Sequence, residues 1–195
     1  MPGDTAPAKT RIHVLICSTR PSRIGPAIAD WFATCARQQE FAEVHLVDLA
    51  DFGLPVFDEP KHPRLRQYEH AHTRRWSASV QAADGFVFVT PEYNYGPPPA
   101  LLNAMAYLVH EWAYKPVAFV SYGGISGGLR GVQMTKQVAT TLRMLPVFEA
   151  VVVPSVNQQL SPAGTFAPTP QQEQAVAPLM NELHRTAVAL RPLRG

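Results

Sequence analysis

The sequence predicts a doubly wound α/β domain, in which a parallel sheet of five strands in the order 2-1-3-4-5 has helices on both faces. Five short apolar runs, rich in β-branched and aromatic residues, are typical of strands buried on both sides. Segments with the apolar spacing of helices lie between these runs. Because no repeat or linker interrupts the alternation, we expect a single domain over residues 11–195 after a loose tail over residues 1–10.

The elements follow one another along the chain in strict alternation. The predicted strands are residues 12–17, 44–47, 86–89, 117–120 and 147–153. The first helix is expected directly after the first strand, since Ile28, Trp31, Phe32 and Cys35 have i, i+3, i+4, i+7 spacing and Pro26 fits a first turn. Further helices are expected over residues 64–83, 98–112, 128–145 and 170–190, and long loops over residues 51–63 and 157–169.

Composition limits the partners that we expect. Seventeen Lys and Arg residues against fifteen Asp and Glu residues give a net charge of +2, too small to indicate nucleic-acid binding. The two cysteines, Cys17 and Cys35, make no disulfide framework, and neither CxxC nor HExxH supports a metal site. Residues 1–9 lack the apolar segment of a secretory signal, and no stretch approaches the roughly 18 apolar residues of a transmembrane helix. We expect a cytoplasmic protein without metal, nucleic-acid or membrane partners.

The loop after the first predicted strand is suited to a phosphate monoester. It contains the hydroxyl of Ser18 and the guanidinium groups of Arg20 and Arg23, and it leads through Ile24 and Gly25 into a predicted helix. Helix N-terminal amides and arginines both bind phosphate oxygens. Because neither GK[ST] nor GxGxxG follows this strand, we expect a ligand with a single terminal phosphate. The alternative is a polar surface loop with an ordinary helix cap.

Two further loops end at the same predicted edge of the sheet, where open α/β sheets bind ligands. Residues 90–99 combine prolines with Tyr93 and Tyr95, which can border a flat ring, and backbone amides after Glu92 can meet the polar edge of a heterocycle. Residues 121–128 contain four glycines, which allow close approach of the backbone. Taken alone, the first loop also fits a proline-rich helix start and the second a flexible turn.

Together these loops resemble the NADPH-dependent FMN reductase family of flavodoxin-like proteins, over roughly residues 11–153. The resemblance rests on Ser18-Thr19-Arg20, on the PEYNY sequence of residues 91–95 followed by Leu101 to Ala104, and on Tyr122-Gly123-Gly124 with Gly127, Gly128 and Arg130. It implies that FMN is bound by Ser18, Arg20, Arg23, Ile24, Gly25, Pro91, Glu92, Tyr93, Asn94, Tyr95, Tyr122, Gly123 and Gly124. The chain departs from the family pattern at Cys17, usually glycine, and at Leu102 and Ala106, where many members carry Lys and Asp.

The resemblance also implies that the chemistry resides on the cofactor and not on a catalytic side chain. Hydride would pass from NADPH or NADH to bound FMN, and then, in a ping-pong order, to flavin, a quinone or another small acceptor. One alternative is a flavodoxin-type carrier of single electrons, and another is a flavin-binding regulatory protein without turnover. Electron carriers of this type are usually strongly acidic, so a net charge of +2 argues against the first alternative.

A second apolar stripe on two predicted helices indicates self-association. The stripes over residues 98–112 are Leu101, Met105, Leu108 and Trp112, and then Leu102, Ala106, Val109 and Ala113. The helix over residues 128–145 carries a similar pair. Because an exposed apolar stripe is unusual on a monomer, we expect a two-fold homodimer, and the sequence leaves open whether dimers pair into tetramers. We also predict that residues 51–63 form a wall or lid near the flavin, either the chain's own or that of a partner subunit; an ordinary surface loop is the alternative.

Overall fold

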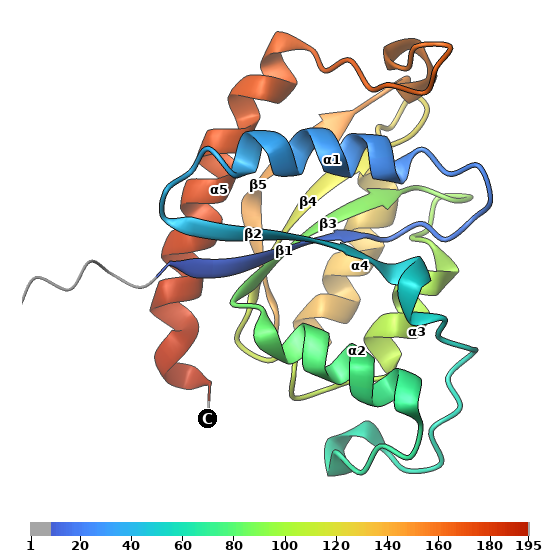
Figure 1. Ribbon diagram of the computed structural model, residues 1–195, viewed down its shortest axis with the longest axis vertical. Helices are drawn as coiled ribbons and strands as arrows, with labels where there is room; N and C mark the ends of the chain where they lie inside the picture. Colours follow the sequence, from blue (N-terminus) through green and yellow to red (C-terminus); the bar gives the residue numbers. More distant parts are fainter. Residues whose placement is uncertain (1–8, 195) are drawn as a thin grey trace, which may run out of the picture.

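Five parallel strands form one sheet in the order β2-β1-β3-β4-β5 in the computed structural model, which describes residues 9–194 (Figure 1). The strands are β1 (Thr10–Ile16), β2 (Ala42–Asp48), β3 (Gly85–Pro91), β4 (Pro116–Tyr122) and β5 (Leu145–Val153). All seven residues of β3 and of β4 are buried, which explains why their sequences are apolar without alternation. The predicted fold class and strand order are confirmed.

The helices cover both faces of the sheet (Figure 1). They are α1 (Gly25–Ala36), α2 (Ala71–Ala82), α3 (Pro99–Ala106), α4 (Leu129–Thr141) and α5 (Pro170–Leu190). Helices α1 and α5 pack on the face that receives Ile12, Val14 and Ile16 of β1. Helices α2, α3 and α4 pack on the other face, where Leu15 is buried. Alternate residues of β1 therefore belong to two separate cores, as the pleat of a strand requires.

Three predicted helices are longer than the helices in the structure. Helix α2 begins at Ala71 and not at residue 64, because Arg66 adopts a left-handed conformation and the Glu59 carboxylate holds the amides of Glu69 and His70 ahead of the helix. Helix α3 ends at Ala106, six residues early, and α4 ends at Thr141, four residues early. Trp112 is fully buried although it lies in turns after α3, so apolar spacing could not reveal where that helix ends.

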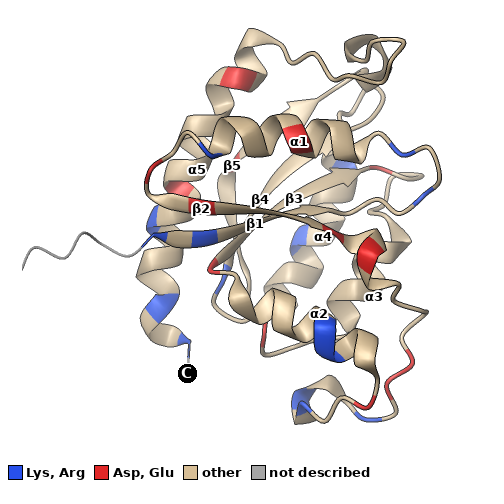
Figure 2. Cartoon of the chain, in the orientation of Figure 1, with Lys and Arg blue, Asp and Glu red and all other residues tan. Residues whose placement is uncertain are grey.

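Residues 1–8 of the predicted tail over residues 1–10 lie outside the described residues. Thr10 is the first residue of β1 and is fully buried, because its amide donates to the Phe41 carbonyl at 3.1 Å and its hydroxyl lies 3.0 Å from Nδ1 of His184. The predicted boundary between tail and domain, after residue 10, is therefore too late, because Thr10 already belongs to β1. Figure 2 shows basic and acidic residues spread over both helical layers and the loops, in keeping with the small net charge.

Candidate functional site

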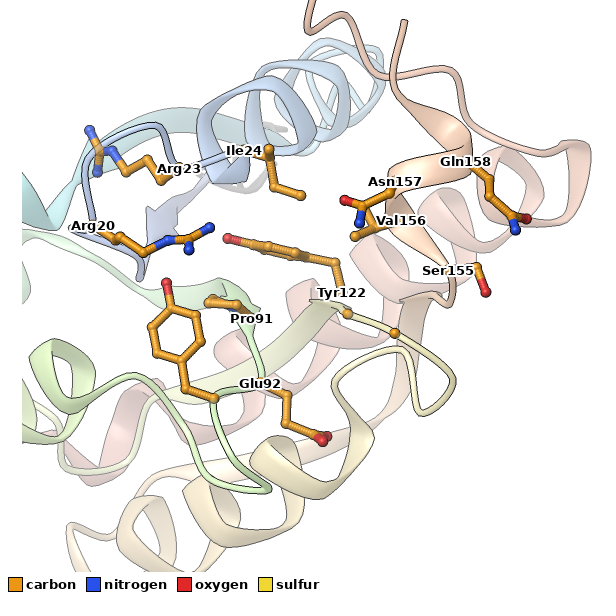
Figure 3. Close-up of a pocket in the computed structure, with 13 residues that line it drawn as sticks. Arg20, Arg23, Ile24, Pro91, Glu92, Tyr122, Ser155, Val156, Asn157 and Gln158 are labelled. Atoms are coloured by element: carbon orange, nitrogen blue, oxygen red, sulfur yellow. The ribbon is translucent and has the colours of Figure 1, made fainter.

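A cavity of about 380 Å³ lies at the carboxyl ends of the central strands and brings together all three predicted loops (Figure 3). We call it the site cavity. It is lined by Arg20, Arg23, Ile24, Pro91, Glu92, Tyr93, Tyr122, Gly123, Gly124, Ser155, Val156, Asn157 and Gln158. Nine of these residues were predicted from the sequence. The position agrees with the rule that open α/β sheets bind ligands where the strand order reverses, here between β1 and β3.

The two arginines of the loop after β1 are used differently. The guanidinium of Arg20 points into the site cavity (Figure 3), and it has no hydrogen-bond partner within residues 9–194. The guanidinium of Arg23 points away from the cavity and binds the Asp48 carboxylate, with one Nη1–Oδ1 distance of 2.6 Å. It also donates to the Ser18 carbonyl at 2.5 Å. Of the two predicted guanidinium groups, only that of Arg20 points into the cavity, because Asp48 at the end of β2 binds that of Arg23.

Ser18 and Gly25 lie beneath the site cavity and do not line it. Ser18 is fully buried, and its Oγ accepts a hydrogen bond from the Tyr122 hydroxyl at 3.2 Å. A Cβ atom on Gly25 would lie 2.5 Å from this Oγ and 2.7 Å from the Tyr122 hydroxyl oxygen, so only glycine fits there. Burial raises the pKa of Tyr122, whose ring crosses the cavity in Figure 3. The start of α1 and the end of β4 are thus fixed to each other under the loop.

The loop after β3 is a tight hairpin-like turn. Tyr93 and Gly96 exchange two backbone hydrogen bonds of 2.9 Å, and Asn94 and Tyr95 between them have positive φ angles of 50° and 70°. This conformation favours Asn at the first position, which explains part of the PEYNY sequence. Pro91, Glu92 and Tyr93 reach the site cavity, whereas Asn94 and Tyr95 at the tip of the turn do not line it. Tyr95 instead lies 3.7 Å from the Arg130 guanidinium carbon.

Glu92 is held by hydrogen bonds that turn its carboxylate away from the site cavity (Figure 3). Nε of Arg130 donates at 2.7 Å, the Ser126 hydroxyl at 2.8 Å and the Arg130 amide at 3.1 Å. Burial alone would raise the pKa of Glu92, but these hydrogen bonds hold it below its ordinary value. A carboxylate kept ionised and occupied in this way is a poor general base, so Glu92 contributes to the cavity through its backbone.

The loop after β5 is the part of the cavity wall that the sequence did not reveal. Ser155 and Val156 donate backbone hydrogen bonds to the carbonyls of Gly124 and Gly123, at 2.8 and 3.0 Å. These bonds place Asn157 and Gln158 at the side of the site cavity opposite Arg20 (Figure 3). The sequence offered one indication that residues 154–158 belong to the site, which is that they directly follow a strand that pairs with β4.

Residues 51–63 do not line the site cavity, and their predicted place near a flavin stays a prediction. Asn103 of α3 holds the loop elsewhere: its Oδ1 accepts from the Phe57 amide at 2.9 Å, and its Nδ2 donates to the Pro55 carbonyl at 2.6 Å. Phe57 lines a different cavity, with Leu108 and Leu142.

The residues of the site cavity fit FMN in size and in chemistry. At one end the unpaired guanidinium of Arg20 lies near the N-terminus of α1, which suits a phosphate. Pro91 and the backbone of Gly123 and Gly124 line the rest of the wall, and the Tyr122 ring crosses the cavity toward Arg20, a lining that suits an uncharged flat ring. Within residues 9–194 no group of three or more His, Cys, Asp or Glu side chains could hold a metal ion. In the same range, no helix has both the length and the apolar character needed to cross a bilayer.

The fold defines the class: a flavodoxin-like protein, with a cavity at the switch point of its sheet. The model of the NADPH-dependent FMN reductase family matches residues 10–158, and the chain belongs to this family. An NAD(P)H-dependent FMN reductase of Schizosaccharomyces pombe is 40% identical over 148 residues, 74% of each chain. The NAD(P)H-dependent FMN reductase LOT6 of Saccharomyces cerevisiae is 34% identical over 145 residues, 69% of this chain and 75% of its own.

Solved structures show the same fold. The flavoenzyme NAD(P)H:acceptor oxidoreductase FerB of Paracoccus denitrificans superposes with a TM-score of 0.68 at 16% identity, over 94% of this chain and 98% of its own. A flavodoxin of Streptococcus pneumoniae superposes with a TM-score of 0.53 at 12% identity, over 90% and 97%. Family membership makes this chain an oxidoreductase with FMN as cofactor and NADPH or NADH as co-substrate, which confirms these predictions.

Proposed function

We propose that this oxidoreductase works in a ping-pong order, in which NAD(P)H and then a small acceptor, flavin or a quinone, occupy the same site in turn. The observation that supports this most directly is the single site cavity, which joins the loops after β1, β3, β4 and β5. FMN, when bound, supplies the hydride chemistry between the two substrates. With FMN bound in this one cavity, the two substrates are expected to reach it in turn.

The role of the protein residues is to position the cofactor and to keep water out. We assign the phosphate end to Arg20, whose guanidinium is unpaired within residues 9–194, supported by Ser18, Arg23, Ile24 and Gly25. The ring end is assigned to Pro91, Glu92, Tyr93, Asn94, Tyr95, Tyr122, Gly123 and Gly124. Asn94 and Tyr95 act there indirectly, by forming the turn that presents the backbone of Glu92 and Tyr93.

Steady-state kinetics test this proposal. NADPH oxidation is measured over a grid of NADPH and quinone concentrations, and double-reciprocal plots with parallel lines are the expected result. Intersecting lines would mean that both substrates bind together and would refute the ping-pong order. A single-electron carrier would instead show negligible NADPH oxidation, and a regulatory flavoprotein would bind FMN, visible by its absorbance, without turnover.

We further propose a cytoplasmic homodimer in which each protomer is one FMN-binding domain, with α3 and α4 at the interface. The first apolar stripe of α3 is fully buried against the sheet, as Leu101 and Met105 illustrate. The second stripe is exposed or half-buried, including Ala106, and on α4 the Met134 side chain is 48% exposed. The loop over residues 51–63 lies beside this surface and would face the partner's site. Light scattering at micromolar concentration should report at least twice 21.4 kDa, and a 21 kDa monomer that retains FMN and activity would refute the dimer.

A further inference from the structure

A second cavity, of about 270 Å³, lies at the opposite ends of the strands from the site cavity. Lys115 directly precedes β4, and Arg143 lies two residues before β5, so this cavity faces the amino ends of the strands. Its charged lining residues are Arg66, Lys115, Arg143 and Arg194, and within residues 9–194 no Asp or Glu lines it. We call it the basic cavity. Four cationic side chains around one hollow repel one another unless an anion lies between them.

The carboxylates nearest to the basic cavity are already engaged. Asp84 accepts hydrogen bonds from Arg194 at 2.8 Å and from Arg191 at 3.2 Å. Glu111 accepts from the hydroxyls of Tyr68 at 2.8 Å and Ser77 at 2.7 Å. Both hydroxyls bind Oε1 of Glu111, and its buried Oε2 has no hydrogen-bond partner within residues 9–194. Arg194 is paired with Asp84, and within the same range Arg66, Lys115 and Arg143 form no ion pair with a carboxylate.

Two guanidinium groups therefore remain available. Within residues 9–194, Arg66 makes no side-chain hydrogen bond, and Arg143 makes only a long contact of 3.4 Å from Nη1 to the Tyr114 hydroxyl. Both side chains are solvent-exposed, so a ligand can reach them. A planar guanidinium binds two oxygens of one phosphate or carboxylate at once, which makes a pair of such groups selective for oxyanions.

Lys115 supplies a third cation from the interior. The residue is only 3% exposed, and its ammonium donates to the carbonyls of Val80 at 2.7 Å and Gln81 at 3.0 Å, at the end of α2. An ammonium has three protons, so one donor remains for a ligand. Burial, followed by the charge of Arg194, lowers the pKa of Lys115 to about 7, against the opposing effects of Asp84 and Glu111. An anion in the cavity would favour the charged form of this lysine.

The backbone around the basic cavity is held in an unfavourable conformation. Arg66, Tyr114 and Arg143 have positive φ angles of 53°, 58° and 59°, and all three line this one cavity. Non-glycine residues avoid this region, and where they adopt it they often hold ligand-binding groups. The Tyr114 amide donates to the Arg143 carbonyl at 2.9 Å, which fixes these two residues to each other.

We propose that the basic cavity binds a small multivalent phosphate anion, of the size of pyrophosphate or the diphosphate of a nucleotide, separately from FMN. The cavity is smaller than the roughly 300–1,000 Å³ of sites for drug-sized molecules, so it suits a phosphate group and not a complete dinucleotide. Arg66 and Arg143 hold the anion at the mouth, and Lys115 meets it inside. The basic cavity lies at the amino ends of the strands and Arg20 lies at their carboxyl ends, so the basic cavity and the site cavity can be filled together.

Calorimetric titration of the FMN-saturated protein with sodium pyrophosphate, at constant ionic strength, tests this proposal. Saturation with FMN keeps pyrophosphate from the phosphate end of the site cavity. We expect saturable binding near one equivalent per chain, weakened about tenfold or more in Arg143→Gln and in Arg66→Gln. The matched control is Arg185→Gln, because the Arg185 side chain is 79% exposed on α5 and does not line the cavity; this variant should bind pyrophosphate as the unmodified protein does.

Three results would overturn the proposal: no saturable heat, equal weakening in the Arg185→Gln control, or unchanged affinity in both cavity variants. A change in the mass of the assembly in Arg66→Gln or Arg143→Gln, without a change in affinity, would assign these cations to a contact between protomers instead. A parallel titration with adenosine diphosphate distinguishes a nucleotide from a free anion by which of the two binds more tightly. Retention of FMN absorbance shows that each variant is folded.

Discussion

The loop after β1 and the loop after β3 both line the site cavity and use their charges in opposite ways. At the first loop, Asp48 binds Arg23 and leaves the neighbouring Arg20 open to a ligand. At the second loop, Arg130 and Ser126 occupy the only carboxylate, that of Glu92. The cavity is thus cationic at one end and neutral at the other. This asymmetry matches a ligand with an anionic tail and an uncharged ring, and under our proposal the phosphate of FMN lies at Arg20.

The largest loss of stability and of FMN affinity is expected at Gly25, where a single added carbon disturbs the packing beneath the phosphate end. Gly25→Ala places a methyl group within 2.7 Å of both the Ser18 and the Tyr122 hydroxyl oxygens, so both must move. Overpacking of this kind costs about 1–3 kcal/mol, and we expect that loss in the free energy of unfolding together with weaker FMN binding.

Gly124→Ala is the matched control at the ring end, because no atom lies within 4 Å of a Cβ there. This variant should unfold at the same denaturant concentration as the unmodified protein. Equal stability of Gly25→Ala and Gly124→Ala in urea titrations would contradict the packing described beneath the phosphate end.

Arg23→Ala tests whether the paired arginine supports the loop and does not bind the ligand directly. It removes hydrogen bonds to Asp48 and to the Ser18 carbonyl from a side chain that is 20% exposed. We expect the free energy of unfolding to fall by about 1–2 kcal/mol. The FMN dissociation constant should rise less than in Arg20→Ala, and the reverse order in equilibrium titrations would exchange the roles of the two arginines.

His13 is buried in β1, outside both loops, so its titration changes the stability of the fold and not the site cavity. Burial, with the nearby His45, lowers the pKa of His13 from 6.5 to about 4. Between these values the unfolded chain binds more protons than the folded chain, so stability is lost as the pH falls from about 6.5 to about 4. In His13→Phe we expect this dependence to weaken by about 3 kcal/mol, or roughly 7–14 °C of Tm, over that range. An unchanged slope in thermal melts across this range would contradict the assignment to His13.

The smallest effect is expected at Glu92. Removing a general base typically lowers the rate by about 10²–10⁴-fold. Because the Glu92 carboxylate is bound by Arg130 and points away from the cavity, Glu92→Gln should change kcat by less than about threefold. A loss of a hundredfold in NADPH oxidation, at full FMN occupancy, would show that this carboxylate takes part in proton transfer after all.

Much of this molecule follows from local sequence, and the remainder depends on partners distant in the chain. The last helix was predicted with both ends correct, since the capping box of Thr169 and Gln172 is encoded within four residues. The orientation of Arg23 depends on Asp48, 25 residues away. The contribution of residues 155–158 depends on hydrogen bonds to Gly123 and Gly124, formed only once β5 pairs with β4. Neither of these long-range dependences produces a residue spacing that can be recognised in the sequence.

The central claim is that Arg20 defines an anion-binding, cationic end of the site cavity. It is tested most directly by titrating apoprotein, unmodified and Arg20→Ala, with FMN and with riboflavin, which lacks the phosphate. We expect Arg20→Ala to weaken FMN binding by about 1.5–3 kcal/mol, the size of a charge-assisted hydrogen bond, and to leave riboflavin binding unchanged. Equal weakening for both ligands, or no weakening for FMN, would contradict this account.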